Sequence, residues 1–205
     1  MALQNRVTPR GDLVAVVERG TFMGNRGRLH DEHRRVRRWA DGRRWIICVL
    51  EFRGRHRRVM APNRYTELFF LDEATALAAG HRPCYECRRE DYQRFLGAWL
   101  AARPSRSDGA KVRAEELDRA LDAERRQGRH RRTFAGHVDE LPDGAMVERD
   151  GEAALVLGGR LLTWSPGGYG PARPAPTATL TVLTPASTVA ALRQGYQPVL
   201  HPSAR

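Results

Sequence analysis

The chain has 205 residues, of which 41% are apolar and 29% charged, a composition typical of a globular protein that buries a core without disulfide bonds. No run approaches the roughly 20 consecutive apolar residues of a membrane helix, and the first residues lack the apolar segment of a secretory signal. Three cysteines cannot form an even disulfide set. These features argue against a membrane span and a disulfide-rich secreted fold, and they predict a cytoplasmic protein.

The positive charge is concentrated in one segment. The net charge is +11, and residues 19–64 contain 14 arginines against four acidic residues. Arginine supplies 34 of the 35 basic residues, so a GC-rich genome accounts for part of the arginine content but not for its position. A localised basic surface is typical of proteins that bind polyanions. The pattern favours nucleic acid as the partner over a merely solvated basic face, and it gives no reason to expect a membrane.

The N-terminal third is predicted to be rich in strands. We expect strands over residues 12–18 and 66–70. Between them, residues 36–39 and 44–52 flank Asp41-Gly42, a dipeptide typical of two-residue hairpin turns. The arginine-rich segment is therefore expected to form a β-hairpin.

Helices are expected from residue 72 onward. Asp72 is a suitable N-cap for a helix over residues 73–79, which Gly80 would end. A second helix would have Pro83 in its first turn, where proline is favoured. A third and highly charged helix is predicted over residues 112–127, beyond a polar linker.

The last third of the chain is predicted to be β-rich again. Residues 145–147, 153–157 and 160–164 have the alternation and glycine turns of a three-stranded meander. A glycine- and proline-rich loop is expected over residues 165–176. A further strand then leads to a short terminal helix that starts at Thr184-Pro185.

This order of elements predicts an α+β fold. N-terminal β-hairpins and helices would surround a Cys-x-x-Cys zinc site, and an antiparallel meander with a terminal short helix would follow. The expected units are a basic zinc-binding module (residues 1–104), a charged helical connector (105–140) and a small β-rich module (141–205). The last of these is also a candidate site for a protein partner.

Cys84 and Cys87 form a Cys-x-x-Cys pair at the expected start of the second helix. Two thiolates at this spacing converge on one metal ion, and a helix N-terminus stabilises their negative charge. A redox pair is the weaker interpretation, because the βαβ pattern of thioredoxin-like motifs is absent. A pair of inert buried cysteines is the remaining alternative.

A closed tetrahedral zinc site needs two further ligands. His30 and His33 follow a glycine-rich loop, and His30 is the first candidate. Cys48 is a rival to His33 for the fourth position, although a cysteine in an apolar strand is more often a small core residue. The sequence therefore predicts Zn²⁺ on Cys84, Cys87, His30 and His33, with Cys48 as the rival fourth ligand.

A stretch of 20 residues, 69–88, carries a family pattern. It begins with Phe69-Phe-Leu-Asp-Glu, continues through an expected Ala-Leu-Ala-Ala-Gly helix and ends with Arg82-Pro-Cys-Tyr-Glu-Cys87 and Arg88. This stretch resembles the second half of the Ada-type methylphosphotriester zinc domain. The resemblance implies a DNA-binding module whose zinc sits on four cysteines, one of which accepts a methyl group. Cys84 and Cys87 match the family's downstream pair, and Arg82 matches its arginine before proline. The whole chain also looks similar to a bacterial family without an assigned activity.

The chain departs from the Ada pattern upstream. The stretch from residue 20 to residue 33, where that family has its first cysteine pair, contains no cysteine. A methyl-accepting cysteine is therefore missing from this position. The resemblance supports a zinc-stabilised module that binds nucleic acid and argues against methyl-transfer repair.

An enzymatic alternative rests on a second motif. His30-Asp-Glu32 followed by Pro83-Cys84-x-x-Cys87 matches the H-x-E…P-C-x-x-C signature of zinc deaminases, in which the glutamate shuttles protons. The context argues against it, because a helix is predicted where that fold needs a strand before the cysteine pair. Glu32 is a catalytic candidate only in this alternative, in which the chain modifies nucleic acid as a nuclease, glycosylase or deaminase.

The sequence favours a zinc-stabilised protein that binds nucleic acid, DNA before RNA, in repair or processing. The arginines expected to contact phosphates near the metal are Arg26, Arg28, Arg82, Arg88 and Arg89. The expected hairpin would widen this surface with Arg34, Arg35, Arg37, Arg38, Arg43 and Arg44.

Overall fold

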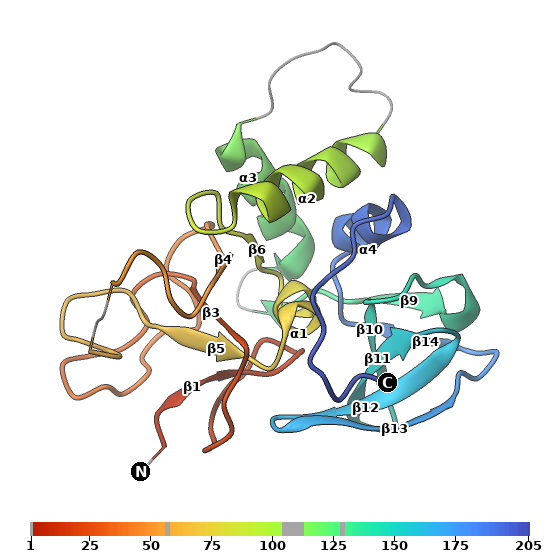
Figure 1. Ribbon diagram of the computed structural model, residues 1–205, viewed down its shortest axis with the longest axis horizontal. Coiled ribbons are helices and arrows are strands. Elements are labelled where there is room, and N and C mark those ends of the chain that lie inside the picture. Colours follow the sequence, from red (N-terminus) through yellow and green to blue (C-terminus); the bar gives the residue numbers. More distant parts are fainter. Residues whose placement is uncertain (1, 56–57, 104–112, 128–129) are drawn as a thin grey trace.

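The computed structural model describes residues 2–55, 58–103, 113–127 and 130–205. It confirms the α+β class: two six-stranded sheets lie side by side, and helices cover them at one end (Figure 1). In the part of the chain that is described, no helix has the length and apolar character needed to cross a bilayer. The predicted linker over residues 104–110 lies outside the described residues.

The first sheet has the strand order β2-β1-β5-β3-β4-β6. The β1–β5 and β4–β6 pairs are parallel, and the other neighbours are antiparallel. Its strands are β1 (Gln4–Val7), β2 (Leu13–Ala15), β3 (Phe22–Asn25), β4 (Ile46–Cys48), β5 (Leu68–Phe70) and β6 (Arg82–Pro83).

The second sheet is antiparallel throughout, with the order β13-β12-β11-β10-β14-β9. Its meander β10–β11–β12 confirms the prediction for this part of the chain. Its strands are β9 (Phe134–His137), β10 (Met146–Arg149), β11 (Glu152–Leu157), β12 (Arg160–Ser165), β13 (Gly168–Pro174) and β14 (Thr179–Val182). A separate small hairpin pairs β7 (Arg126–Gln127) with β8 (His130–Arg131).

The helices follow the predicted order. They are α1 (Glu73–Ala78), α2 (Arg89–Ala101), α3 (Ala114–Arg125) and α4 (Ala186–Arg193), with a 3₁₀ turn at Val138–Glu140. Asp72 caps α1 as expected, because its carboxylate accepts the Thr75 backbone N–H at 2.9 Å. Gly80 follows with a φ of +90°, the left-handed conformation that ends the helix.

The predicted hairpin of residues 36–39 and 44–52 is wrong. β4 pairs with β3 on one side and with β6 on the other, so no position is left for residues 36–39. Two further boundaries also differ. Pro83 lies in the edge strand β6 instead of in the first turn of a helix, and α2 begins only at Arg89. The predicted loop over residues 165–176 contains β13, which pairs with β12.

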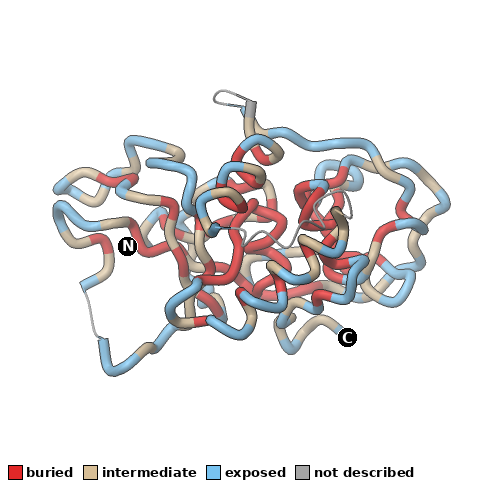
Figure 2. The backbone as a smooth tube through the Cα atoms, turned by 90° about the horizontal axis from the view of Figure 1, so that it is seen from above, coloured by how far each residue is buried: buried red, intermediate tan, exposed pale blue. Residues whose placement is uncertain are grey.

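The two sheets share a hydrophobic core. Buried residues gather in the middle of the molecule, between the two ends formed by the sheets (Figure 2). One contiguous cluster includes Ile47 of the first sheet, Phe95 of α2, Leu117 of α3 and Val147 of the second sheet. The second sheet also includes Phe134–His137, which the sequence analysis placed in a connector. The expected modules are thus packed together through α1, α2 and α3.

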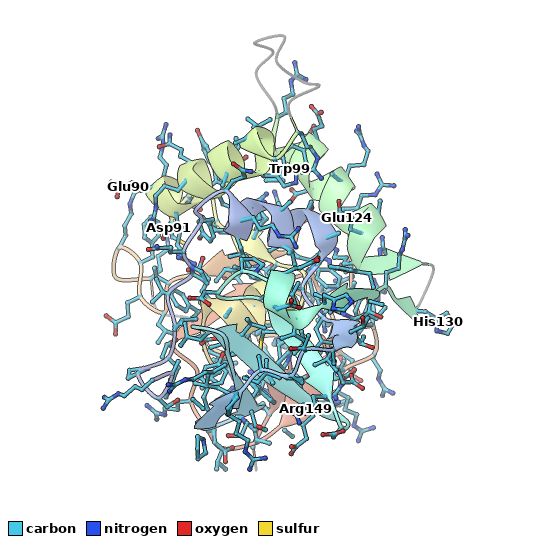
Figure 3. All side chains as sticks on the ribbon, turned by 90° about the vertical axis from the view of Figure 1, so that its right-hand side faces the viewer. Glu90, Asp91, Trp99, Glu124, His130 and Arg149 are labelled. Atoms are coloured by element: carbon cyan, nitrogen blue, oxygen red, sulfur yellow. The ribbon has the colours of Figure 1, made fainter. Side chains whose placement is uncertain are left out.

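Polar contacts, some buried and some partly exposed, hold the helices in place. Glu124 of α3 accepts the Ser187 backbone N–H at the start of α4 and a hydrogen bond from Arg103, which follows α2 (Figure 3). Glu73 of α1 is bound at both carboxylate oxygens by the guanidinium of Arg88, at 2.8 and 2.9 Å. Because Arg88 immediately follows Cys87, this buried ion pair fixes the segment that carries the cysteine pair.

Candidate metal centre

Three cysteines converge where β4 meets the turn after β6. The sulfur atoms of Cys48, Cys84 and Cys87 all lie within 4.8 Å of one another. The backbone aligns them, because the parallel β4–β6 pairing lets the Cys84 N–H donate to the Ile47 carbonyl at 2.9 Å. Three thiolates around one tetrahedral zinc are about 3.8 Å apart, since each Zn–S bond is about 2.3 Å. The three cysteines could therefore hold one metal ion.

Backbone amides surround the sulfur of Cys84. The Glu86 N–H donates to Cys84 Sγ at 3.4 Å, and the Cys87 amide donates to it as well. Hydrogen bonds from the thiols of Cys48 and Cys87 hold the pKa of Cys84 well below its usual value. The bond to Cys84 raises the pKa of Cys48, which acts as the donor. The cluster thus concentrates negative charge on the sulfur of Cys84, the form that binds metal, while the pKa values of Cys48 and Cys87 are raised.

The cysteines open onto a cavity of about 400 Å³. Its wall combines apolar residues with two arginines, Arg44 and Arg55, and the buried carboxylate of Glu67. Glu67 Oε2 accepts the Met60 N–H at 2.7 Å, which ties this wall to the loop before β5. Arg55 forms an ion pair at 2.9 Å with Glu86, one of the two residues between the cysteines of the pair. The cluster therefore borders a cavity with basic groups beside it.

The histidines predicted as ligands lie outside this cluster. His30 is buried, but its Nδ1 pairs with Thr66 Oγ1 at 2.6 Å and its Nε2 with the Ala61 carbonyl at 3.1 Å. Both ring nitrogens are thus engaged in fixing the loop. His33 is exposed and lies 3.5 Å from Glu32, which is itself 77% exposed. The structure brings Cys84 and Cys87 together with Cys48 instead of with His30 or His33.

Three of the five arginines expected to contact phosphates are buried. Arg26 lies over the rings of Trp39 and Trp45 and donates to the Gly11 carbonyl. Arg82 forms two hydrogen bonds to the Asp118 carboxylate, at 2.8 and 2.9 Å, and Arg88 is bound to Glu73. These guanidinium groups hold the fold together and do not face solvent. The two that remain at the surface are Arg28 and Arg89.

An arginine-rich surface remains, and two of its members, Arg44 and Arg55, line the cavity of the metal centre. The surface is formed by the loops on either side of β4, drawn in orange in Figure 1. Between residues 28 and 64, the exposed acidic side chains among the described residues are Glu32, Asp41 and Glu51. The exposed arginines of this stretch, which we call the basic surface, are Arg28, Arg35, Arg37, Arg38, Arg43, Arg44, Arg53, Arg55, Arg58 and Arg64. Arg34, also expected on this surface, is half-buried.

Sequence reasoning ranked His30 above Cys48, and the signal that favours Cys48 appears only in the burial pattern of β4. In β4, Ile47 is fully buried, whereas Ile46 and Cys48 on either side of it are partly exposed. Side chains alternate between the two faces of a strand, so Cys48 points away from the core that Ile47 fills. A cysteine out of phase with the core is a better ligand candidate than a small core residue.

Comparisons with family models, curated proteins and solved structures returned no match for this chain. The interpretation of the site therefore rests on its own geometry.

Proposed function

We propose that this chain is a zinc protein that binds nucleic acid, DNA before RNA, through the basic surface. One observation carries the proposal: Arg44 and Arg55 line the same cavity as Cys48, Cys84 and Cys87. A nucleic-acid backbone bound to these arginines would lie beside the metal centre. The resemblance of residues 69–88 to the Ada-type zinc domain supports the same function.

Zinc has a clear structural role in this proposal. Cys48 ends β4, and Cys84 and Cys87 lie between β6 and α2. An ion shared by the three sulfurs would join the strand that leads into the arginine-rich loop to the segment that enters α2. Tetrahedral thiolate sites contribute folding free energy directly. Zinc would thus hold the loops of the basic surface in a fixed arrangement.

Neutralising two arginines should weaken nucleic-acid binding and its salt dependence. With Arg28→Gln and Arg44→Gln combined, we expect the slope of log K against log [salt] to fall by about two, because each lost phosphate contact removes close to one released counterion. The measurement is a fluorescence-anisotropy titration of a DNA duplex and a single-stranded oligonucleotide between about 50 and 200 mM salt.

Arg160→Gln is the matched control for this titration, because Arg160 is also exposed but belongs to β12 in the other sheet. It should leave the slope unchanged. Wild-type binding that does not depend on salt, or an equal loss with Arg160→Gln, would contradict a role for the basic surface.

The enzymatic alternative has less support from the geometry. A deaminase-like centre on His30, Glu32, Cys84 and Cys87 needs a free His30 nitrogen, and both nitrogens are engaged. Glu32 is largely exposed and lies next to His33, which makes it a poor proton shuttle. We therefore favour binding over catalysis by these four residues.

A further inference from the structure

The ligand set of the metal centre is incomplete among the described residues. The chain has three cysteines, and all of them are in the cluster. Within the described ranges, no His, Asp or Glu contributes an atom to the same group. Glu86, the nearest acidic residue in sequence, is paired with Arg55, and the His30 ring is held by Thr66 and Ala61. A tetrahedral ion on the three sulfurs would thus keep one position that no described residue fills.

The cavity lies directly beside the cluster. All three cysteines line it, so a ligand inside the cavity has access to the metal. Apolar side chains form part of its wall: Leu50, Phe52, Val59 and Phe69. Its volume of about 400 Å³ falls in the range of small-molecule sites. The space therefore suits a small ring-shaped group better than a solvated ion.

Charge decides what kind of donor fits the open position. Three thiolates and one divalent ion carry a net charge of −1, and an anionic donor would raise this to −2 in a partly buried site. The cavity lining does not offset this charge, because Arg44 and Arg55 are balanced by the carboxylates of Glu67 and Glu86. A neutral donor avoids this cost. Water and the unprotonated nitrogen of an aromatic heterocycle are neutral donors that zinc accepts.

We propose that the metal centre formed by Cys48, Cys84 and Cys87 has an open fourth position that faces the cavity and takes a neutral heterocyclic nitrogen. Water fills this position when the cavity is empty. The natural source of the heterocycle would be an unpaired base of the bound nucleic acid. In this respect the inference rests on the proposed function. Arg44 and Arg55 at the same cavity would then hold the flanking phosphates.

Cobalt substitution tests this directly in the full-length protein. Co²⁺ on three thiolates has visible absorption bands that change when its fourth ligand changes. We expect 1-methylimidazole, a neutral nitrogen donor, to shift these bands saturably, and azide, an anionic donor of similar reach, to produce no shift. Bands that respond to neither probe, or to azide alone, would overturn the proposal.

A pair of matched variants separates the cavity from the metal. Leu50 is 48% exposed and lines the cavity, so Leu50→Trp should raise the half-saturating 1-methylimidazole concentration by about tenfold, because the larger ring fills the space. Cobalt affinity should not change. Val17 is 81% exposed and lines a neighbouring groove instead of this cavity, so Val17→Trp should have no effect. Equal effects of both variants would overturn the assignment to this cavity.

Histidine variants test whether the chain itself supplies the fourth ligand. His30→Ala and His56→Ala should leave the cobalt bands unchanged. His56 lies outside the described residues, so its variant is the decisive one. Bands altered by either substitution in the folded protein would overturn the open position.

These outcomes can be distinguished from a failure of the proposed function. A closed site with four chain ligands would leave the salt-dependent binding of nucleic acid intact. Conversely, the protein could bind 1-methylimidazole at the metal and have no affinity for nucleic acid. The open position would then stand, and the proposed function, with nucleic acid as the source of the heterocycle, would fail.

Discussion

Replacing Cys48 by serine is expected to lower zinc affinity by more than about 100-fold. Loss of a residue that only hydrogen-bonds to a metal ligand already lowers metal affinity by about 10–100-fold, and Cys48 is a ligand itself. A serine hydroxyl stays protonated at neutral pH and cannot replace a thiolate. The two remaining sulfurs, on Cys84 and Cys87, would form only half of a tetrahedral site. The measurement is zinc stoichiometry after dialysis, followed by competition with a chromophoric chelator.

His30→Ala is the control, because the sequence alone made His30 the first candidate. We expect this variant to keep its zinc and to lose about 1–3 kcal/mol of unfolding free energy, since a buried hydrogen-bonding group is left without its partner. The groups affected are Thr66 Oγ1 and the Ala61 carbonyl. A folded His30→Ala protein without zinc, or a Cys48→Ser protein that retains it, would contradict the cysteine cluster.

The cysteine pair could be predicted from local sequence, but its third partner could not. Cys84 and Cys87 are three residues apart, so their convergence follows from the turn that contains them. Cys48 reaches them only because β4 pairs in parallel with β6, a contact between strands separated by β5 and α1 in the chain. Parallel pairing leaves no signature at a turn, in contrast to a hairpin.

The hairpin prediction failed because β4 pairs with two strands from outside the expected hairpin. Asp41-Gly42 does make a turn, and Gly42 has a φ of +92°. The residues on either side do not pair with each other, because β3 and β6 are available as partners for β4. Strong local turn chemistry therefore located the bend but not the strands. In the second sheet, β10, β11 and β12 pair with their neighbours in sequence, and there the predicted meander is confirmed.

Counting arginines located the basic segment but could not separate surface from interior. Arg26, Arg82 and Arg88 are buried because each meets a partner from a distant part of the chain. Arg82, for example, pairs with Asp118, 36 residues further on. In the sequence, a buried arginine and an exposed arginine are the same residue type. Only the fold shows which guanidinium groups are free to meet a phosphate.

Arg88→Met should destabilise the protein by about 3–5 kcal/mol, which is the cost of breaking a buried ion pair by removing one partner. Glu73 would keep its carboxylate in the core, and the Tyr196 hydroxyl and the Val199 N–H do not neutralise its charge. The measurement is chemical denaturation with the midpoint and slope determined separately. Arg89→Met is the control. Arg89 is exposed, and its loss should change stability by no more than about 0.5 kcal/mol.

The double variant Glu73→Gln with Arg88→Met decides whether the loss comes from the uncompensated charge. Replacing both members of a buried pair is often close to neutral, so we expect much of the stability to return. No recovery would mean that packing of Arg88 against the Phe22 ring, 4.5 Å from its guanidinium, dominates.

The neighbouring residues Arg88 and Arg89 separate an effect on the fold from an effect on binding. Arg88 follows Cys87 directly, so its loss should weaken zinc and nucleic-acid binding only as far as it unfolds the cysteine turn. Arg89→Met should instead weaken nucleic-acid binding in a protein of unchanged stability.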